Sequence, residues 1–173
     1  MNPDHSFTAA TLDELPLIAD LARVIWRSHY PGIISEDQIE YMLERMYSLE
    51  RMGKEVLNEG VVYILARSRA VPIGFAAYGP GAQPEEFRLH KLYLLPAHQR
   101  AGLGRSLLQM ALSEARRRGA SRLALAVNRK NLGALAAYRN YGFRVREAVR
   151  VEIGGGFVMD DFILERALDL ELT

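Results

Sequence analysis

The sequence predicts one domain, residues 1–173, with a mixed α/β architecture. A chain of this length matches one unit by a prior of roughly 150 residues per domain, and it is long enough to bury a sizeable core. Apolar residues of the first third recur at helical spacing, whereas the remainder contains short apolar runs separated by helical segments. The expected element order is therefore β-α-α-(α)-β-β-β-α-β-α-β-β.

The first third is expected to begin with a short strand and to continue as helices. Thr11 or Asp13 caps the first helix, and a Pro-Gly pair stops it. Two serines open the helices that follow, Ser35 in a capping-box pattern with a glutamine three residues later, and Ser48. The expected ranges are 6–9 for the strand and 13–30, 35–47 and 48–60 for the helices.

Strand and helix signals alternate from residue 61 onwards. Apolar runs at 61–66 and 73–78 flank a polar link and predict a β-hairpin. A third apolar run feeds a helix that ends at Gly119, and Asn131 is suited to cap the last helix. Three consecutive glycines divide the final stretch into another hairpin. The expected ranges are 89–95, 123–127, 143–152 and 157–165 for strands, and 102–118 and 131–140 for helices.

Composition excludes several classes of protein. With 49% apolar and 25% charged residues, and no apolar run of the ~20 residues that a membrane span needs, we expect a folded chain that is neither disordered nor integral to a membrane. The chain has no cysteine, so disulfides, thiolate metal sites and a cysteine nucleophile are excluded. No secretory signal is evident at residues 1–11, and we expect a cytoplasmic protein.

The net charge of +1 hides a division of charge along the chain. Residues 98–150 hold twelve basic and two acidic residues, a balance of +10, which leaves −9 for the remainder. Such patches concentrate oppositely charged ligands, so this division fits a polyanionic ligand on one side and a cation on the other. Solvated, arginine-rich helix faces are the alternative interpretation.

The most informative segment is 92–105, where an expected strand runs into a glycine loop that opens a helix. Gly102 and Gly104 let backbone N–H groups approach an anion, and a helix N-terminus adds a partial positive charge. Arg100 and Arg105 are placed to add charge-assisted hydrogen bonds. The third glycine of a dinucleotide fingerprint and the Lys-Ser/Thr pair of a P-loop are both absent, which excludes those two motifs.

Together with the segment 131–143, this loop resembles the GNAT superfamily of acetyl-CoA-dependent N-acetyltransferases. The family's loop has the pattern Gln/Arg-x-x-Gly-x-Gly/Ala, and its second motif combines an asparagine, a helix of small residues and a tyrosine four residues before Gly-Phe. The order and spacing of the two motifs also match. The matching residues are Gln99, Gly102 and Gly104, followed by Asn131, Ala134, Tyr138, Gly142 and Phe143.

The resemblance implies a GNAT-type fold: a mostly antiparallel central sheet flanked by helices, with a parallel central strand pair splayed at the cofactor site. It further implies direct attack of an amine on acetyl-CoA, with Tyr138 as general acid and a backbone N–H near Leu94 polarising the thioester oxygen. Tyr93 to Leu95 would pair with the pantetheine arm. The residues expected to hold the diphosphate are Gln99, Arg100, Ala101, Gly102, Leu103, Gly104, Arg105 and Ser106, assisted by Asn131, for which N-capping is the alternative.

For the general base and for the acceptor site, the sequence offers more than one candidate. His90 at the start of the central strand is a candidate base, because an imidazole titrates in the right range, and Glu85 and Glu86 of the preceding loop are alternatives that would act through water. Trp26 and Tyr30 lie four residues apart and either form an aromatic wall for an alkylammonium or pack in the core. Glu40 and Glu44 are expected to assist the wall, with a solvated helix stripe as the alternative.

The sequence therefore predicts an N-acetyltransferase for a primary amine, with a polyamine or another small cationic metabolite favoured by the acidic remainder of the chain. The alternatives are an acetyl-CoA sensor without turnover and an enzyme that acetylates a protein or peptide. We expect no metal, no nucleic-acid partner and no membrane partner, since the arginines lack an aromatic stacking pattern. A homodimer is expected from the resemblance.

Overall fold

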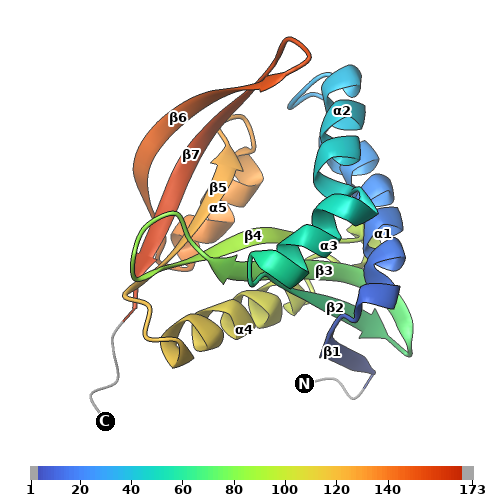
Figure 1. Ribbon diagram of the computed structural model, residues 1–173, viewed down its shortest axis with the longest axis vertical. Helices are drawn as coiled ribbons and strands as arrows, with labels where there is room; N and C mark the ends of the chain where they lie inside the picture. The colour runs from blue at the N-terminus through green and yellow to red at the C-terminus, as the bar shows by residue number, and fades with distance from the viewer. Residues whose placement is uncertain (1–3, 169–173) are drawn as a thin grey trace. The chain divides into compact units, whose positions relative to one another are not determined.

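The computed structural model describes residues 4–168, and its element order from the N-terminus to the C-terminus can be followed in Figure 1. The chain divides into two compact units, Met1–Pro80 with Leu89–Ala111, and Gly81–Arg88 with Leu112–Thr173. Neighbouring strands are hydrogen-bonded in the order β1-β2-β3-β4-β5-β7-β6. Strand β4 (Glu86–Leu94) and helix α4 (Leu103–Arg117) each contribute residues to both units.

The first unit contains an antiparallel arrangement of β1 (His5–Ala9), β2 (Val62–Ser68) and β3 (Val71–Pro80). Residues Arg69 and Ala70 join β2 to β3, and both have positive φ, 47° and 69°. A two-residue loop with two positive φ angles matches the right-handed twist of a hairpin. The hairpin predicted here is therefore confirmed, although Asn and Gly, which favour such a turn, are missing from it.

A short 3₁₀ helix and three α-helices follow β1, and Thr11, Ser35 and Ser48 cap the 3₁₀ helix and the last two α-helices, whereas the first α-helix begins without a side-chain cap. Thr11 and Glu14 form a capping box around the short 3₁₀ helix η1 (Leu12–Glu14), which leads into α1 (Leu15–His29). The Ser35 hydroxyl accepts from an N–H of α2 (Glu36–Tyr47), and the Ser48 hydroxyl accepts from one of α3 (Leu49–Asn58), each at 3.2 Å. These bonds satisfy donors that a helix start otherwise leaves without a partner.

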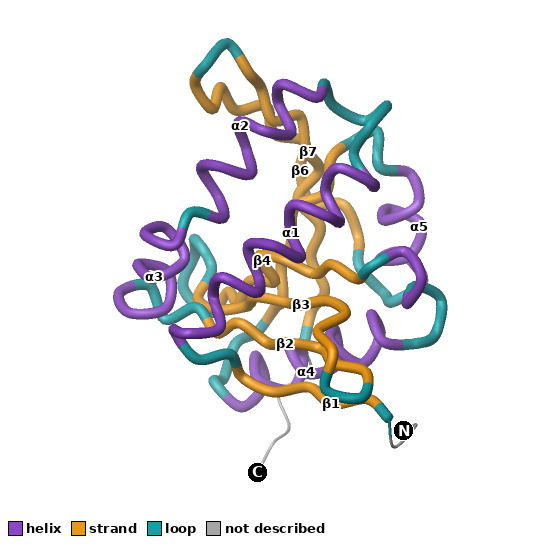
Figure 2. The backbone as a smooth tube through the Cα atoms, turned by 90° about the vertical axis from the view of Figure 1, so that its right-hand side faces the viewer, coloured by secondary structure: helices purple, strands orange, loops and turns teal. Residues whose placement is uncertain are grey.

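The core of the first unit is rich in aromatic side chains. Helix α1 packs against β3, and Figure 2 shows it crossing the strands. Trp26, Tyr47, Tyr63 and Phe75 are each at most 1% exposed. The rings of Trp26 and Tyr47 meet edge-on with centroids 5.7 Å apart, a favourable geometry for aromatic pairs. Burial of several rings of this size supplies much of the hydrophobic stabilisation of this unit.

The second unit is built from β5 (Arg122–Asn128), β6 (Arg144–Gly154) and β7 (Phe157–Ala167), with helix α5 (Leu132–Asn140). Strand β7 is antiparallel to both β5 and β6. The start of β4 joins them as the one parallel pair, and its register with β5 covers Glu86–Arg88 against Arg122–Ala124. The sheet is thus mostly antiparallel with one parallel pair, as the resemblance implied.

The sequence placed Glu86 on a loop, whereas it is the first residue of β4 and is buried. Its carboxylate accepts a hydrogen bond from Arg146 at 2.6 Å and from the Ala82 N–H at 3.3 Å, and it lies 3.8 Å from Arg122. The loop glutamate considered as a base is therefore held in an ion pair of the second unit.

None of the helices in the described part of the chain has the length and apolar character needed to cross a membrane.

Candidate active site

Strand β4 ends at Leu94 with one backbone edge facing β3. The Leu95 N–H donates to the Ile73 carbonyl oxygen at 2.9 Å, and the Tyr93 carbonyl oxygen would lie only 2.5 Å from a Cβ added at Gly74. Because alternate residues of a strand direct their backbone polar groups to opposite edges, the Leu94 N–H points away from β3. A donor on that edge is suited to polarise a carbonyl oxygen.

The loop after β4 adopts a conformation that depends on its glycines. Gly102 has φ +80° with nothing within 4 Å of an added Cβ, and Arg100 also has positive φ, 63°. The Gln99 side-chain amide donates to the Leu94 carbonyl oxygen at 3.1 Å, which ties the loop to the end of the strand. Ser106 closes the first turn of α4 through its N–H, 3.1 Å from the Gly102 carbonyl oxygen.

This loop presents backbone donors and positive charge together. Leu103 and Gly104 open α4, so the first N–H groups of the helix have no acceptor one turn earlier. Arg100, Ala101 and Arg105 are exposed, whereas the Leu103 side chain is 5% exposed and anchors the helix to the core. A helix N-terminus with flanking guanidinium groups is a site for a phosphate-type anion.

The second motif of the sequence begins at the start of α5. The Asn131 side-chain oxygen accepts from the Ala134 N–H at 3.2 Å, so the N-cap expected as the alternative is present. Tyr138 lies on the same helix, half-buried, with its ring edge-on to Phe143 at a centroid distance of 5.6 Å. That contact orients the ring while part of it stays accessible, as a proton donor requires.

The aromatic residues proposed for the acceptor differ in accessibility. Trp26 is 1% exposed and lies in the core, with its indole nitrogen buried. Tyr30, half-buried at the end of α1, has its hydroxyl 2.9 Å from that of Tyr93 on β4. This contact brings one expected acceptor residue and one expected cofactor residue together. The packing alternative thus fits Trp26, and a role in binding stays a prediction for Tyr30.

The two acidic residues of α2 are not equivalent. Glu40 forms a bidentate ion pair with Arg27 of α1, with both hydrogen bonds at 2.7 Å, and the guanidinium holds the pKa of Glu40 below its ordinary value. Glu44 is exposed one turn later and makes no ion pair within the described residues. Glu44 is therefore the residue of this pair that is placed to bind a cationic ligand near α2, because the Glu40 carboxylate is already paired with Arg27.

His90 occupies the middle of β4 and is half-buried. Leu92 and Leu94 contact the position of Gly104 on α4, with side-chain atoms 3.8 and 3.7 Å from an added Cβ. Side chains alternate along a strand, so His90 lies on this α4 side, whereas Tyr93 faces the aromatic cluster. The expected base and the expected acceptor wall are thus on opposite faces of β4.

Comparison with known proteins decides which family these features represent. The sequence pattern described as the Acetyltransferase (GNAT) family matches residues 18–143, which is most of the chain. The chain belongs to the GNAT acetyltransferase family. The match includes the glycine loop and the helix that carries Tyr138, so the resemblance expected from those motifs is confirmed.

Individual relatives match between half and most of the chain. A spermidine N(1)-acetyltransferase of Thermoplasma acidophilum is 28% identical over 154 residues, which is 87% of this chain and 92% of the relative. An L-methionine sulfoximine/L-methionine sulfone acetyltransferase of Salmonella typhimurium is 32% identical over 89 residues, about half of each protein. The enzyme class that the sequence predicted, an acetyltransferase, is therefore confirmed.

Solved GNAT structures share the fold. The PaiA N-acetyltransferase of Thermoplasma acidophilum, solved in complex with coenzyme A, has a TM-score of 0.78 at 26% identity and covers 94% of this chain and 98% of its own. The ribosomal-protein-S18-alanine N-acetyltransferase of Escherichia coli has a TM-score of 0.70 at 20% identity, and the match covers 95% of this chain and 94% of that protein. The second likeness shows the fold alone.

The structure also reveals a buried ionic cluster that the sequence reasoning missed. Lys91 of β4 donates to both carboxylate oxygens of Glu55, at 2.8 and 2.9 Å, and its Nζ lies 2.8 Å from the Tyr63 hydroxyl, which itself donates to Glu55. Burial lowers the pKa of Lys91. A lysine on the same strand face as Leu89 and Tyr93 was the available signal, because a buried charge requires a partner.

A second missed residue is Asp161 on β7. It is 6% exposed, and burial together with the neighbouring charge of Asp160 raises its pKa to about 6. A carboxyl group with a perturbed pKa in a GNAT enzyme is a candidate for acid–base chemistry. Its signal in the sequence is an acidic residue between Met159 and Ile163 on the same face of the strand.

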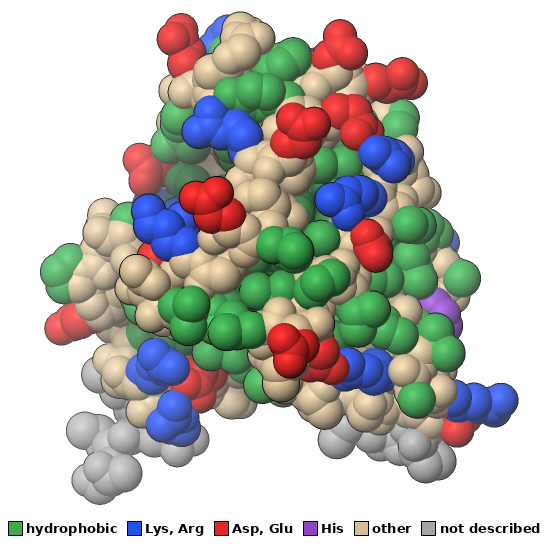
Figure 3. All heavy atoms as spheres, turned by 45° about the vertical axis from the view of Figure 1, so that its right-hand side comes forward, with side chains coloured by type: hydrophobic (Ala, Val, Ile, Leu, Met, Phe, Trp, Pro, Cys, Tyr) green, Lys and Arg blue, Asp and Glu red, His purple; other side chains and the backbone are tan. Residues whose placement is uncertain are grey.

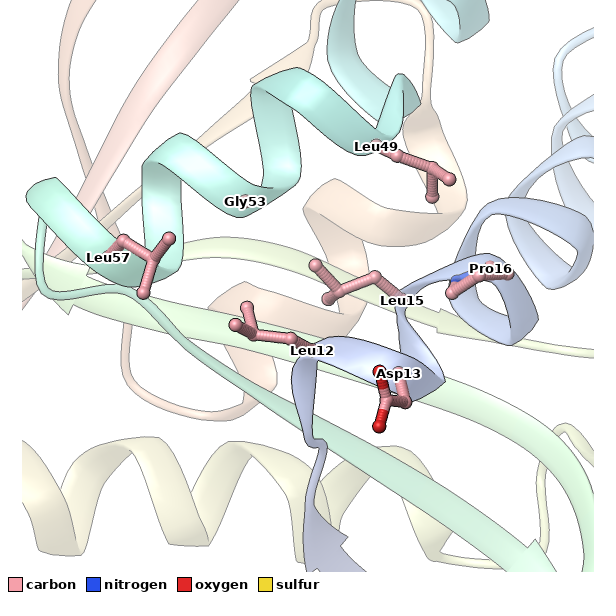
Figure 4. A pocket seen from close by; sticks show the side chains of 7 residues that line it. All are labelled: Leu12, Asp13, Leu15, Pro16, Leu49, Gly53 and Leu57. Carbon is pink, nitrogen blue, oxygen red and sulfur yellow. The ribbon is translucent and has the colours of Figure 1, made fainter.

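The described residues contain no group of three or more metal-ligating side chains. An open pocket of about 440 Å³ lies between the start of α1 and helix α3, lined almost entirely by apolar side chains with Asp13 as the exception (Figure 4). No residue of the glycine loop lines it. Figure 3 shows apolar side chains gathered on one face between charged ones, and three pocket residues are exposed apolar side chains, Leu12, Leu49 and Leu57.

Proposed function

We propose that this GNAT enzyme transfers the acetyl group of acetyl-CoA directly to a primary amine, and that the amine is a polyamine or another small cationic metabolite. The observation that carries the proposal is the loop from Gln99 to Ser106, which combines left-handed backbone, exposed arginines and the N-terminus of α4. Such a loop fits the diphosphate of coenzyme A by charge and by accessible donors. A chain without cysteine is also consistent with transfer without a cysteine acyl intermediate.

The residues of this chain would act on the acetyl donor at three points. The N–H groups at the start of α4, with Arg100 and Arg105, would hold the diphosphate, and Asn131 would contribute through the helix that it caps. The edge of β4 away from β3 would pair with the pantetheine arm, and of Tyr93 to Leu95 it is Leu94 that directs its backbone polar groups there, because the Leu95 N–H donates to the Ile73 carbonyl oxygen. The Leu94 N–H would stabilise the negative charge that develops on the thioester oxygen.

Tyr138 is proposed as the general acid. The departing thiolate requires a proton, and a phenol held by Phe143 but still accessible is suited to donate it. Acetyl-CoA supplies the activated thioester when bound. Positioning of the thioester and protonation of its sulfur are the contributions assigned to this chain.

The acceptor class is supported by charge. The chain outside residues 98–150 has a balance of −9, and Glu44 is an exposed, unmatched acid on α2. The similarity over 87% of the chain to an enzyme named for spermidine points in the same direction. Tyr30, held by Tyr93, offers an aromatic surface of the kind that alkylammonium groups prefer.

The test is thiol release from acetyl-CoA, followed with a colorimetric disulfide reagent. Because the protein contains no cysteine, every thiol that forms belongs to coenzyme A. We expect release with polyamines and little with amino acids, aminoglycosides or lysine peptides. Release only with peptides would assign a protein substrate instead, and tight acetyl-CoA binding with no amine-dependent release would indicate a sensor.

A cytoplasmic homodimer is the proposed setting. Strand β6 is the last strand in the order and pairs on one side only, with β7. It carries the exposed apolar residues Val145 and Val151, and an edge strand with apolar side chains is a surface for pairing with a second chain. Light scattering on a sizing column tests this: a single monomer mass at micromolar concentration would refute the dimer.

A further inference from the structure

Asp161 lies in the middle of the sheet of the second unit. It is opposite Asn128 of β5 on one side and opposite Val149 of β6 on the other. Its residue surface is 6% exposed, and no hydrogen bond or ion pair to its carboxylate is made by the residues from 4 to 168. A carboxylate this deeply buried normally has a donor or a cation, since burial without one costs free energy.

The same unit contains a buried carboxylate that is fully matched. Glu86 is 5% exposed and is held by Arg146 at 2.6 Å and by a backbone N–H. No equivalent partner faces Asp161. The charged groups near it are Asp160 on the same strand, whose charge raises the pKa of Asp161, and Arg88 of β4, which lowers it without forming an ion pair among the described residues. Stability therefore offers no reason for an aspartate at this position.

The side of β7 on which Asp161 lies follows from its neighbours. The Arg129 guanidinium covers the Phe162 ring at 5.0 Å, and Arg166 donates to the Tyr141 carbonyl oxygen at 2.9 Å, just beyond the end of α5. Phe162 and Arg166 thus face α5. Because side chains alternate along a strand, the Asp161 side chain lies on the face of the sheet opposite α5, the helix that carries Tyr138.

We propose that Asp161 is the carboxylate that binds the ammonium group of the acceptor and takes a proton from it; this inference rests on the proposed function. A buried carboxylate that has no partner among residues 4–168 is complementary to a single cation. A proton acceptor on one face of the sheet and a proton donor, Tyr138, on the other separate the two proton transfers in space. That arrangement suits a reaction in which nitrogen enters and sulfur leaves.

Acetyl transfer to an ammonium ion releases one proton in total. The acceptor arrives as an ammonium ion and leaves as a neutral amide, so its nitrogen loses two protons while the N–C bond forms and the C–S bond breaks. Asp161 receives the first proton and passes it to water. The second replaces the proton that Tyr138 gives to the sulfur, so the products are the amide, the thiol of coenzyme A and one released proton.

The chain offers a matched control beside the proposed residue. Asp160 is adjacent on β7 and points to the other face, where it pairs with Arg129 at 3.3 Å and is 45% exposed. Asp161→Asn and Asp160→Asn remove the same charge one residue apart and are both nearly isosteric. Circular dichroism and coenzyme A affinity would establish that each variant is folded with its donor site intact.

For Asp161→Asn we expect kcat/KM for spermidine at pH 7.5 to fall by about 10²–10⁴-fold, the range for loss of a positioned proton acceptor, with acetyl-CoA affinity unchanged. The acidic limb of the wild-type kcat/KM profile should have a midpoint near pH 6 and be absent from the variant. Asp160→Asn should retain the rate and the limb, with the midpoint of the limb moved to lower pH, because the Asp160 charge that raises the pKa of Asp161 is removed. Equal losses in the two variants, or an intact rate in Asp161→Asn, would overturn the proposal.

Calorimetric binding of spermidine to the complex with coenzyme A separates this inference from the proposed function. Asp161→Asn should bind spermidine at least about tenfold more weakly than wild type, as expected for loss of a buried cation partner. If wild type binds spermidine through Asp161 but releases no thiol, the ammonium site stands and the proposed transfer fails. If binding is unaffected by Asp161→Asn, the ammonium site is refuted whatever the turnover.

Discussion

The buried cluster of Glu55, Tyr63 and Lys91 allows a quantitative test of what holds β4 in the first unit. The side chains of Lys91 and Glu55 are 3% and 9% exposed. Breaking a buried ion pair by removing one partner costs about 3–5 kcal/mol, because the other charge is left in an apolar environment. Lys91→Met leaves Glu55 with the Tyr63 hydroxyl and with Arg51 at 3.3 Å. We therefore expect a loss of about 3 kcal/mol, the low end of that range.

Glu55→Met should lower the free energy of unfolding more than Lys91→Met does, because Lys91 would keep only the Tyr63 hydroxyl as an acceptor among its contacts. The double variant replaces both charges with apolar side chains, and such replacements are often nearly neutral. The double variant should lose less unfolding free energy than the two single variants lose together, by at least about 2 kcal/mol. A coupling of this size is typical of residues in one network.

Urea denaturation of the four proteins followed by circular dichroism gives these free energies of unfolding. In thermal melts, a loss of about 3 kcal/mol corresponds to a fall in Tm of roughly 6–12 °C for a domain of this size. Losses below about 1 kcal/mol in both single variants, or additivity in the double variant, would show that the cluster behaves like an exposed ion pair and would refute this reasoning.

Three further predictions concern the cofactor loop, the general acid and Asp161. Gly104→Glu should abolish acetyl-CoA binding measured by calorimetry, whereas Gly104→Ala should bind normally, because its Cβ meets Leu94 and Leu92 at the ordinary distances of 3.7 and 3.8 Å; equal binding by both variants would place the diphosphate elsewhere. Tyr138→Phe should lower kcat by at least about 10²-fold without changing acetyl-CoA affinity, and an unchanged kcat would mean that another group protonates the thiolate. A pKa of Asp161 raised from 3.8 to about 6 means that the native state holds the proton more tightly than the unfolded state, so its contribution to the free energy of unfolding should fall by about 2 kcal/mol as pH rises from 4 to 7. Urea denaturation of wild type against Asp161→Asn across that range measures this contribution, and a constant difference would contradict the assigned pKa.

Features set by local chemistry were predictable from the sequence. Ser35, Ser48 and Asn131 cap the helices that their side chains indicated, and Gly102 has the left-handed conformation that a tight loop before a helix requires. The motifs at 99–104 and 131–143 are similarly local, because each forms one loop and the start of one helix. Recognition of the family therefore required no knowledge of long-range contacts.

Features that depend on pairing between distant segments were not predictable in the same way. The partner of Lys91 comes from α3, 36 positions earlier, and that of Arg27 comes from α2. The environment of Asp161 depends on the register of β5, β6 and β7, and a shift of one residue would move its side chain to the other face. For Trp26 and Tyr30, helical spacing places both on one face but does not say whether that face is covered.

The central claim is direct acetyl transfer from acetyl-CoA to a small cationic amine, and one measurement tests it most directly. Wild-type protein is incubated with acetyl-CoA and spermidine, released thiol is quantified colorimetrically, and acetylated products are quantified by mass spectrometry. We predict one acetylated spermidine for each thiol released, with no acetyl group left on the protein. Thiol release without acetylated amine, or no spermidine-dependent release from a protein that binds acetyl-CoA tightly, would contradict the claim.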